Sequence, residues 1–319
     1  MRIPLEVNSM GKTVVIALGG NALGTNFSEQ NAAIQKTSKS IVDLVEQGHR
    51  VILSHGNGPQ VGLIHDAMDE FNHTHAQPPI PLPVCVAMSQ GYIGYNLQSA
   101  IGAELRNRGI RKPIATVLTQ VKVDPSDPAF QHPTKPIGPY LSKEEAEQLA
   151  CDKGYTIVSD SGRGQRRAVA SPIPLEIVEV ETIRALLDAG QMVIASGGGG
   201  IPIIMDGYRI QGVEAVVDKD LATACLAKEL NADWLIILTT VQKVALHYGK
   251  AEQRWLDKIT AAEARRYIQE GHFAPGSMLP KVQAAVDFAE SVPGRVALIT
   301  QLQEVGNGIL SKAGTRITC

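Results

Sequence analysis

Six short apolar runs recur along the chain, separated by stretches that are typical of helices. The runs cover residues 13–18, 50–53, 114–118, 192–195, 234–238 and 296–299. The helical stretches are 29–46, 61–70, 90–108, 219–230 and 277–290, and the first places Ile34, Ile41, Val42 and Val45 on one face. Strands that alternate with helices predict an α/β fold with a mainly parallel sheet covered by helices on both faces.

The segment 124–174 interrupts this alternation. It carries prolines at 125, 128, 133, 136 and 139, and a further pair at 172 and 174. Ser142 and Glu145 have the spacing of a helix capping box, as do Thr260 and Glu263 nearer the C-terminus. We interpret 124–174 as an insertion that forms a lid or small protruding subdomain.

Composition excludes several classes of protein. The 319 residues are 44% hydrophobic and 19% charged, with a formal net charge of -2 and 4% aromatic residues, which argues against nucleic acid as a partner. No apolar stretch reaches the ~18–20 residues of a membrane span. Residues 1–10 lack the apolar core of a signal peptide, and we interpret them as a native extension or a cloning remnant outside the fold. Scattered cysteines at 85, 151, 225 and 319 indicate reduced thiols and a cytoplasmic location.

Three of the apolar runs lead into glycine-rich loops. These loops are Gly19-Gly20-Asn21, then Ser54-His55-Gly56-Asn57-Gly58, and Gly197-Gly198-Gly199-Gly200 after Ser196. Ligands bind at the carboxyl ends of parallel strands, where glycines let backbone N–H groups approach an anion. Together the loops predict a phosphate-binding site, although each alone also fits a tight strand-to-helix turn. The chain has no Walker-type P-loop sequence.

Three lysines stand where a structural role explains them poorly. Lys281 lies near the expected start of a helix, where the helix dipole disfavours a cation unless it shares a bound anion. Lys219 lies between Asp218 and Asp220 at another helix start, where carboxylates suit capping but a lysine does not. Lys135 lies in the proline-flanked loop 133–136 and means little alone.

The histidines do not predict a metal site. None has H-x-x-x-H spacing, and we interpret His55 and His272 as structural residues. We therefore assign no metal-binding residue to the chain.

From residue 11 to the C-terminus the sequence resembles the carbamate kinases of the amino acid kinase family. The resemblance rests on Ala17-Leu-Gly-Gly-Asn-Ala22, Ser54-His-Gly-Asn-Gly-Pro-Gln-Val-Gly62, Gln90-Gly91 with Asn96-Leu97, Thr116-Val-Leu-Thr-Gln120, Pro133-Thr-Lys-Pro-Ile-Gly-Pro139, Gly197-Gly-Gly-Gly-Ile-Pro202, Gly212-Val-Glu-Ala-Val-Val-Asp-Lys-Asp220 and Gly271-His-Phe-Ala-Pro-Gly-Ser-Met-Leu-Pro-Lys281. The family's usual Gly-Arg-Gly-Trp is here Gly162-Arg-Gly-Gln165, and its usual Val-Asp is here Val241-Gln242.

This resemblance implies a three-layer αβα sandwich around an open, mainly parallel eight-stranded sheet, with a small protruding lid. It implies one domain, 11–319, with a carbamate and phosphoryl half at about 11–205 and a nucleotide half at about 206–319. It further implies a homodimer that transfers a phosphoryl group reversibly between ATP and carbamate with Mg²⁺, giving ADP and carbamoyl phosphate.

The resemblance also implies roles for particular residues. Lys135, Lys219 and Lys281 stabilise the phosphoryl group and Asp220 organises the lysines. Phosphate and carbamate contact Gly19, Gly20, Asn21, Ser54, Gly56, Asn57, Gly198 and Gly199, and the nucleotide contacts Lys219, Tyr248, Met278 and Lys281.

Carbamate is already an anion, so the reaction needs charge stabilisation and alignment and no general base. We expect use in the direction of ATP synthesis, in arginine-type catabolism. Two alternatives stay open: another small-carboxylate kinase of the same fold, and a nucleotide-binding regulator without catalysis.

Overall fold

The computed structural model describes residues 11–19, 27–159, 164–310 and 312–319. Its centre is an eight-stranded sheet with the strand order β15-β17-β16-β12-β1-β2-β9-β3. The neighbouring strands from β16 to β3 are parallel, whereas β17 pairs antiparallel with β16 and parallel with β15. The bounds are β1 Thr13–Leu18, β2 Arg50–His55, β3 Ile114–Thr116, β9 Met192–Ile194, β12 Trp234–Leu238, β15 Lys258–Thr260, β16 Val296–Thr300 and β17 Thr315–Thr318.

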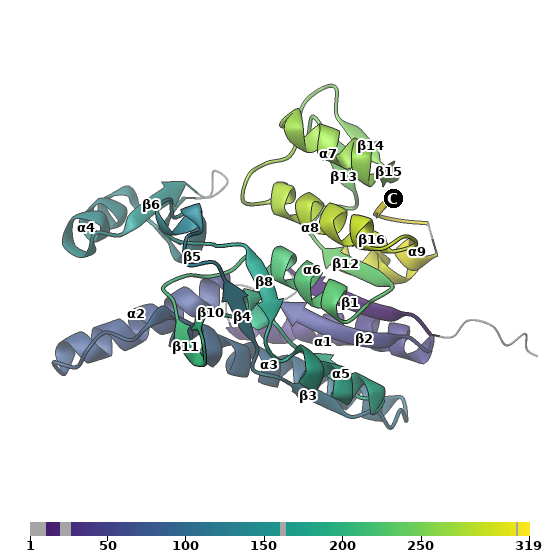
Figure 1. The fold of residues 1–319 in the computed structure, drawn as a ribbon, viewed down its shortest axis with the longest axis horizontal. Helices are drawn as coiled ribbons and strands as arrows, with labels where there is room; N and C mark the ends of the chain where they lie inside the picture. The colour runs from purple at the N-terminus through teal and green to yellow at the C-terminus, as the bar shows by residue number, and fades with distance from the viewer. Residues whose placement is uncertain (1–10, 20–26, 160–163, 311) are drawn as a thin grey trace, which may run out of the picture.

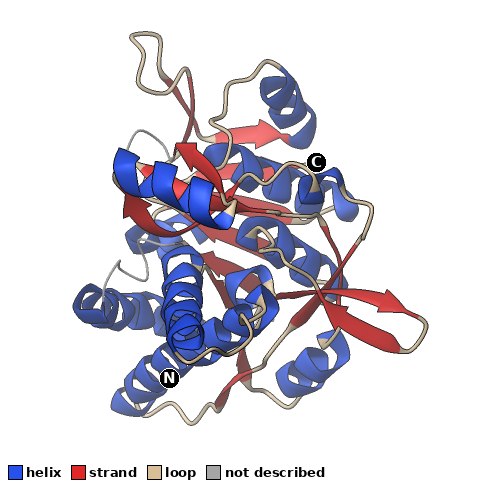
Figure 2. Cartoon of the chain, turned by 90° about the vertical axis from the view of Figure 1, so that its left-hand side faces the viewer, coloured by secondary structure: helices blue, strands red, loops and turns tan. Residues whose placement is uncertain are grey.

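Helices cover both faces of this sheet (Figures 1 and 2). Alternate residues of β1 enter opposite cores: Val14, Ile16 and Leu18 pack with one helix layer, and Val15 and Ala17 pack with the other. Burial on both faces explains why the central strands are continuous apolar runs. The first layer contains α1 Phe27–Glu46, α3 Leu82–Asn107 and α9 Val305–Ile309, and the second contains α5 Val180–Asp188, α6 Lys219–Glu229, α7 Ala261–Gln269 and α8 Met278–Ser291.

A second sheet, absent from the sequence prediction, adjoins the first. It has four strands in the order β11-β10-β4-β8, and a separate hairpin pairs β13 with β14. The bounds are β4 Gln120–Val123, β8 Pro174–Ile177, β10 Ile201–Asp206, β11 Arg209–Gly212, β13 Val244–Leu246 and β14 Arg254–Leu256. Strand β4 pairs parallel with β10, so the chain that leaves β3 and the chain that leaves the four-glycine loop run side by side.

In the described part of the segment 124–174, a small three-stranded sheet and the helix α4 project to the left in Figure 1. Its elements are β5 Lys135–Leu141, α4 Lys143–Lys153, β6 Thr156–Ser159 and β7 Gln165–Val169. Strand β5 packs on α2 Gly58–Thr74 so closely that a Cβ on Gly62 would lie 2.1 Å from the Cα of Gly138. Lys153 also pairs with Asp69 of α2 at 2.6 Å. The insertion is therefore attached along α2.

Several sequence-based boundaries of helices and strands are wrong. Helix α2 extends beyond 61–70 at both ends, and α3 begins at Leu82 instead of 90. Proline is tolerated in the first turn of a helix, and here Pro59 and Pro83 occupy such positions. The strand expected over 114–118 ends at Thr116. Both expected capping boxes are present, Ser142 with Glu145 and Thr260 with Glu263.

No helix among the described residues is long and apolar enough to cross a membrane.

Candidate functional site

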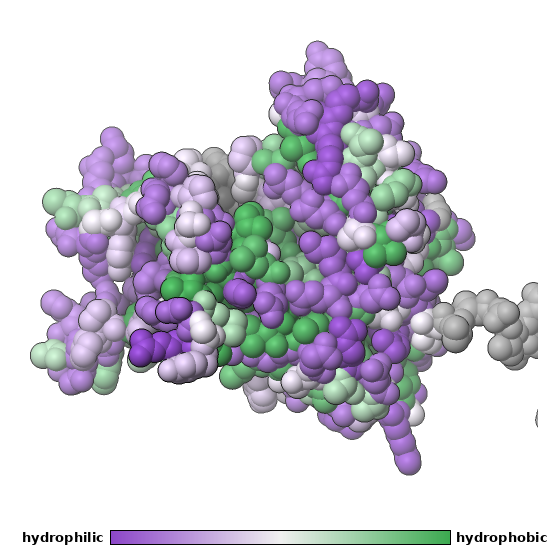
Figure 3. Space-filling model, viewed as in Figure 1, coloured by the Kyte–Doolittle hydropathy of each residue, from purple (hydrophilic) through white to green (hydrophobic). Residues whose placement is uncertain are grey.

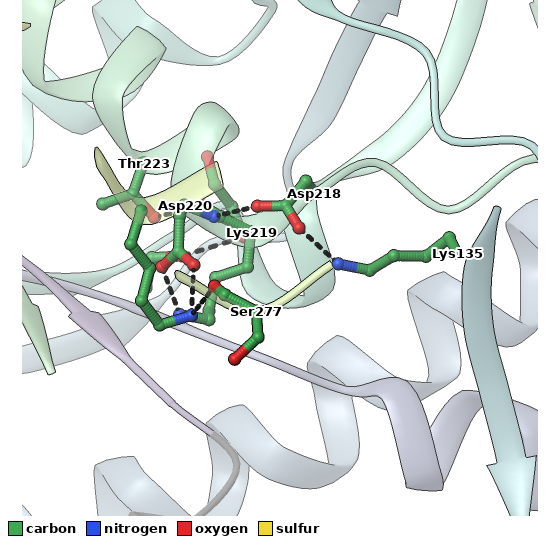
Figure 4. Close-up of polar contacts among 9 residues, drawn as sticks. Lys135, Asp218, Lys219, Asp220, Thr223 and Ser277 are labelled. Carbon is green, nitrogen blue, oxygen red and sulfur yellow. Dashed lines mark hydrogen bonds and ion pairs between the residues drawn. The ribbon is translucent and has the colours of Figure 1, made fainter. Parts of the chain in front are cut away.

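A chain of ion pairs surrounds the N-terminus of α6 (Figure 4). The Asp218 side chain caps the helix by accepting a hydrogen bond from the backbone N–H of Asp220 at 2.9 Å. Lys219 Nζ donates to Asp220 Oδ1 at 2.5 Å, and Lys281 Nζ donates to Asp220 Oδ2 at 3.0 Å. The two oxygens of one buried carboxylate thus hold two lysines that are 62 positions apart in the sequence.

Lys135 reaches this cluster from β5, on the far side of Asp218 from Ser277 in Figure 4, and its ammonium pairs with Asp218 Oδ2. Lys281 Nζ donates to the backbone oxygen of Ser277 at 3.2 Å, which ties it to the turn before α8. Three ammonium groups face two carboxylates, so the cluster carries one positive charge in excess. A site with this balance favours a bound anion.

Burial and the attraction between opposite charges together set the protonation of the cluster. Burial lowers the pKa of Lys219 below its ordinary value, with the positive charge of Lys281 acting in the same sense. Burial also opposes the charged forms of Asp220 and Lys281, but their mutual attraction outweighs it: the pKa of Asp220 is lowered and that of Lys281 is raised. Burial likewise opposes ionisation of Asp218, and Lys135 keeps its pKa low. Both carboxylates are therefore ionised at neutral pH and act as anchors for lysines.

The glycine loops lie directly against this cluster. A Cβ on Gly56 would lie 3.6 Å from Lys219 Cε, so the lysine stem crosses the backbone that follows β2. Gly198 (φ +66°) faces Asn57, and a Cβ there would lie 2.1 Å from Asn57 Nδ2. Gly199 packs in the same way against the Val217 carbonyl, just before the α6 cap. The loops after β2 and β9 and the start of α6 thus form one continuous site.

The other predicted loop residues divide into three groups. Gly19 lies at the end of β1, where a Cβ would lie 2.8 Å from the Leu238 oxygen. Ser54 is buried and donates its hydroxyl to the Ser196 oxygen at 3.1 Å, so it holds the four-glycine loop in place. Gly20 and Asn21 lie outside the described residues.

Helix α3 supports the loops through polar side chains that the sequence prediction did not assign to the site. Asn57 Nδ2 donates to Ser89 Oγ at 2.8 Å. Gln90 Nε2 donates to the oxygens of Thr119 and Gly197 at 3.0 Å each, and Gln90 Oε1 accepts from the Thr119 N–H. The sequence feature that could have revealed these supporting residues is a pair of adjacent polar residues, Ser89 and Gln90, on the side of a helix that faces the core.

A cavity of about 270 Å³ adjoins the cluster on the α8 side. Its lining includes Tyr248 and Met278, both expected to contact a nucleotide, and Ser277, whose backbone oxygen holds Lys281. The remaining lining residues, not foreseen from the sequence, are Thr239, Thr240, Val241, Lys243, Ala245, His272, Phe273 and Ala274. A lining of apolar side chains with a few polar groups is typical of a ligand pocket.

The two histidines singled out from the sequence lie in different surroundings. His55 is buried beside Gly197, and burial lowers its pKa to about 4. His272 lies in the cavity wall with its ring edge-on to His247. The residues that the structure describes contain no group of three or more His, Cys, Asp or Glu side chains that could hold a metal ion.

Comparisons with known proteins identify the family of the chain. The model of the amino acid kinase family matches residues 12–299. The chain is 56% identical to the carbamate kinase-like protein YqeA of Escherichia coli, over 97% of this chain and 99% of that protein. It is 48% identical to the carbamate kinase of Pyrococcus furiosus, over 97% and 99% of the two chains.

The structural comparison gives the same family. The carbamate kinase of Giardia lamblia bound to citric acid aligns with a TM-score of 0.90 at 41% identity, covering 97% of this chain and 98% of that chain. The same enzyme bound to AMP-PNP aligns with a TM-score of 0.86 at 42% identity and equal coverage. The chain belongs to the amino acid kinase family, and the expected open, mainly parallel eight-stranded sheet between helix layers is confirmed.

Proposed function

We propose that this protein is a carbamate kinase, which transfers a phosphoryl group reversibly between ATP and carbamate and gives ADP and carbamoyl phosphate. The observation that carries the proposal is the meeting of Lys135, Lys219 and Lys281 around Asp218 and Asp220, beside the glycine loops. The relatives named carbamate kinase span nearly the whole chain, which supports this acceptor over another small carboxylate.

The geometry supports a mechanism based on charge stabilisation. A carbamate oxygen attacks the γ-phosphorus of ATP, and the bond from that phosphorus to the bridging oxygen of ADP breaks. Negative charge is spread over the transferring group, and fixed ammonium groups stabilise it without reorganising. Lys219 and Lys281 share Asp220, so their positions are set before substrate binds.

Asp220 acts in this mechanism as an organiser of the lysines and not as a base. Each of its oxygens accepts from a lysine, and its pKa lies below the usual range because those lysines outweigh the effect of burial. The attacking oxygen of carbamate also carries no proton that a base would have to remove. Lys135, held by Asp218 on the other side of the cluster, would contact the phosphoryl group from the side of the insertion.

The remaining contacts follow from the positions of the loops and the cavity. Backbone N–H groups around Gly56, Asn57, Gly198 and Gly199 would receive carbamate and phosphate oxygens, while Gly19, Gly20 and Asn21 would extend this surface. The cavity with Tyr248 and Met278 would hold the nucleoside part of ATP. Because Asp218 and Asp220 are both engaged by lysines, Mg²⁺ would enter bound to the nucleotide phosphates, as part of the substrate.

A homodimer belongs to the same proposal. Exposed apolar side chains follow one stripe of α3, at Val84, Met88 and Tyr95, and Leu118 lies exposed just beyond the edge strand β3. Further apolar surface gathers near the middle of the face in Figure 3, where β4 and β8 lie. Sedimentation of wild type and Tyr95→Glu would test the α3 stripe as an interface: the variant should dissociate.

The activity itself is tested by ATP formation from carbamoyl phosphate and Mg-ADP in a coupled assay. Turnover supports the proposal, and a panel of acyl phosphates separates carbamate kinase from a kinase of another small carboxylate. ADP binding without turnover would favour the regulator. Use in the direction of ATP synthesis, in arginine-type catabolism in the cytoplasm, also remains part of this proposal.

A further inference from the structure

Ser196 has an unusual backbone conformation for a residue with a side chain. It follows β9 and adopts φ +50° and ψ +33°, the left-handed region that favours glycine. The next four residues are all glycines, and three of them also have positive φ. Glycine at 196 would remove this strain, so the side chain at this position needs an explanation of its own.

The hydroxyl of Ser196 is unpartnered within the part of the chain that the structure describes. The side chain is fully buried, and its Oγ neither donates to nor accepts from any group of those described residues. The backbone of the same residue is fully engaged: its N–H donates to Thr119 Oγ1 at 2.9 Å, and its oxygen accepts from Ser54 Oγ and from the Gly199 N–H. A buried hydroxyl without a partner is costly, as is the left-handed conformation, and both costs fall on one residue.

The position of Ser196 places it at the acceptor end of the site. By the register of β2 against β9, Leu53 faces Ile194, so Ser196 lies beside the strand end that leads into Gly56 and Asn57. The four-glycine loop that it begins touches both Asn57 and the residue before the α6 cap. It lies away from the cavity of Tyr248 and Met278, which is lined by other residues.

We propose that Ser196 recognises the amino group of carbamate, because its Oγ accepts a hydrogen bond from an N–H of the substrate. This inference rests on the proposed function and adds to it the group that distinguishes carbamate from an acid of similar size. The lysines and the backbone N–H groups recognise oxygens only, which carbamate shares with acetate. The lysines and backbone N–H groups provide donors and no acceptor for the N–H, and Ser196 supplies an acceptor at the start of the loop that packs against Asn57.

The test compares two acyl phosphates as phosphoryl donors to Mg-ADP. Carbamoyl phosphate carries an amino group where acetyl phosphate carries a methyl group, and each gives ATP plus the free acid. The readout is the ratio of the two kcat/KM values. Wild type should favour carbamoyl phosphate, and Ser196→Gly should lower the ratio about tenfold, the scale of losing one neutral hydrogen bond. Ser196→Ala, which keeps the strain, should lower it equally.

Thermal unfolding provides the second readout and Ala76→Gly the matched control. Ala76 has φ +53° and is exposed at the end of α2, so its change relieves similar strain far from the loop. Ser196→Gly should raise Tm by about 2 °C or more, since strain and an unpaired hydroxyl both disappear, while Ala76→Gly should leave the substrate ratio unchanged.

An unchanged ratio in Ser196→Gly, or an equal fall in Ala76→Gly, would overturn the assignment. A wild type that makes no ATP from carbamoyl phosphate would instead refute the proposed function and the Ser196 assignment with it.

Discussion

The candidate site combines two regions that, by our proposal, bind anions in different ways. Around α6, three lysines and two aspartates form a charged cluster. In this cluster the side chains would contact the anion, and the backbone supports them. At the ends of β2 and β9, glycines and buried neutral side chains form a cradle in which, by our proposal, backbone N–H groups contact the ligand. Charge can be removed from the first region without changing its shape. The second region has no charge to remove, and its function depends on the shape of its backbone.

The difference predicts the largest loss of activity in the charged cluster. Lys219→Met and Lys281→Met should each lower turnover roughly 10²–10³-fold, the scale for one preorganised charge-stabilising donor. Asp220 keeps its other lysine in each variant, and the excess positive charge disappears, so Tm should change little. Steady-state assays with carbamoyl phosphate and thermal unfolding measure both. A Lys281→Met protein with nearly wild-type turnover would remove Lys281 from the mechanism.

Replacement of Lys135 tests whether all three lysines of the cluster have the same role. Among the described residues Lys135 pairs with Asp218, and it comes from the inserted segment, whereas the nucleotide cavity lies on the α8 side. Lys135→Ala should lower kcat about 10²-fold and leave ADP affinity nearly unchanged. Calorimetric titration of ADP beside the kinetic assay decides this. Parallel loss of binding and turnover would make Lys135 a nucleotide ligand.

The same residue bears on the idea of a mobile lid. Strand β5, which carries Lys135, places Ile137 in a core with Val61 and Val86, and Gly138 lies in contact with Gly62 of α2. These contacts support movement of the insertion together with α2 more than movement of β5 alone. We expect Lys135 to enter the site after substrate binds, when the insertion closes as a lid, and this expectation stays a prediction.

The cradle should respond to added volume instead of lost charge. At Gly198 a Cβ would lie 2.1 Å from Asn57 Nδ2, and the residue has φ +66°. Gly198→Ala should therefore cost about 2–4 kcal/mol of stability, from the strained backbone and from the clash together. Gly207→Ala is the matched control: its φ is +59° but nothing lies within 4 Å of the added Cβ. Equal destabilisation of the two variants would show that conformation alone matters and that the loop tolerates the extra carbon.

Sequence reasoning located the charged cluster and the cradle with different success. The central strands and both capping boxes follow from local patterns, and the glycine loops follow from their place after strands. The Lys135–Asp218 ion pair joins residues 83 positions apart, which no local pattern encodes. Strand β11 is exposed throughout and β10 is partly exposed, so neither shows the apolar run of a central strand.

Other features were hidden for conformational reasons. The predicted helices 61–70 and 90–108 left out the prolines near the starts of α2 and α3, which lie in the first turns of these helices. The left-handed backbone of Ser196 has no signature in the sequence, because serine itself does not favour that conformation. The positions of Ser89 and Gln90 beneath the loops depended on knowing which face of α3 is buried.

The smallest predicted effect separates the two regions by their response to pH. The carboxylates of Asp218 and Asp220 have lowered pKa values, so the stability they contribute is present above the unfolded pKa of about 4 and is lost only in stronger acid. His55, beneath the cradle, behaves differently. Burial lowers its pKa to about 4, against the hydrogen-bonding contribution of the Gly56 oxygen and with that of the Lys219 charge.

The folded state therefore binds fewer protons than the unfolded state once the pH falls below 6.5, and stability declines from there towards pH 4. Between pH 6.5 and 5.5 the loss is about 1 kcal/mol for one such group. His55→Gln should reduce the fall in Tm between pH 6.5 and 5.5 relative to wild type, whatever its effect on Tm at pH 7.5. If the Tm of His55→Gln falls between pH 6.5 and 5.5 as steeply as that of wild type, other groups control the response and the imidazole is protonated without cost. The cradle would then share the tolerance of acid expected for the charged cluster.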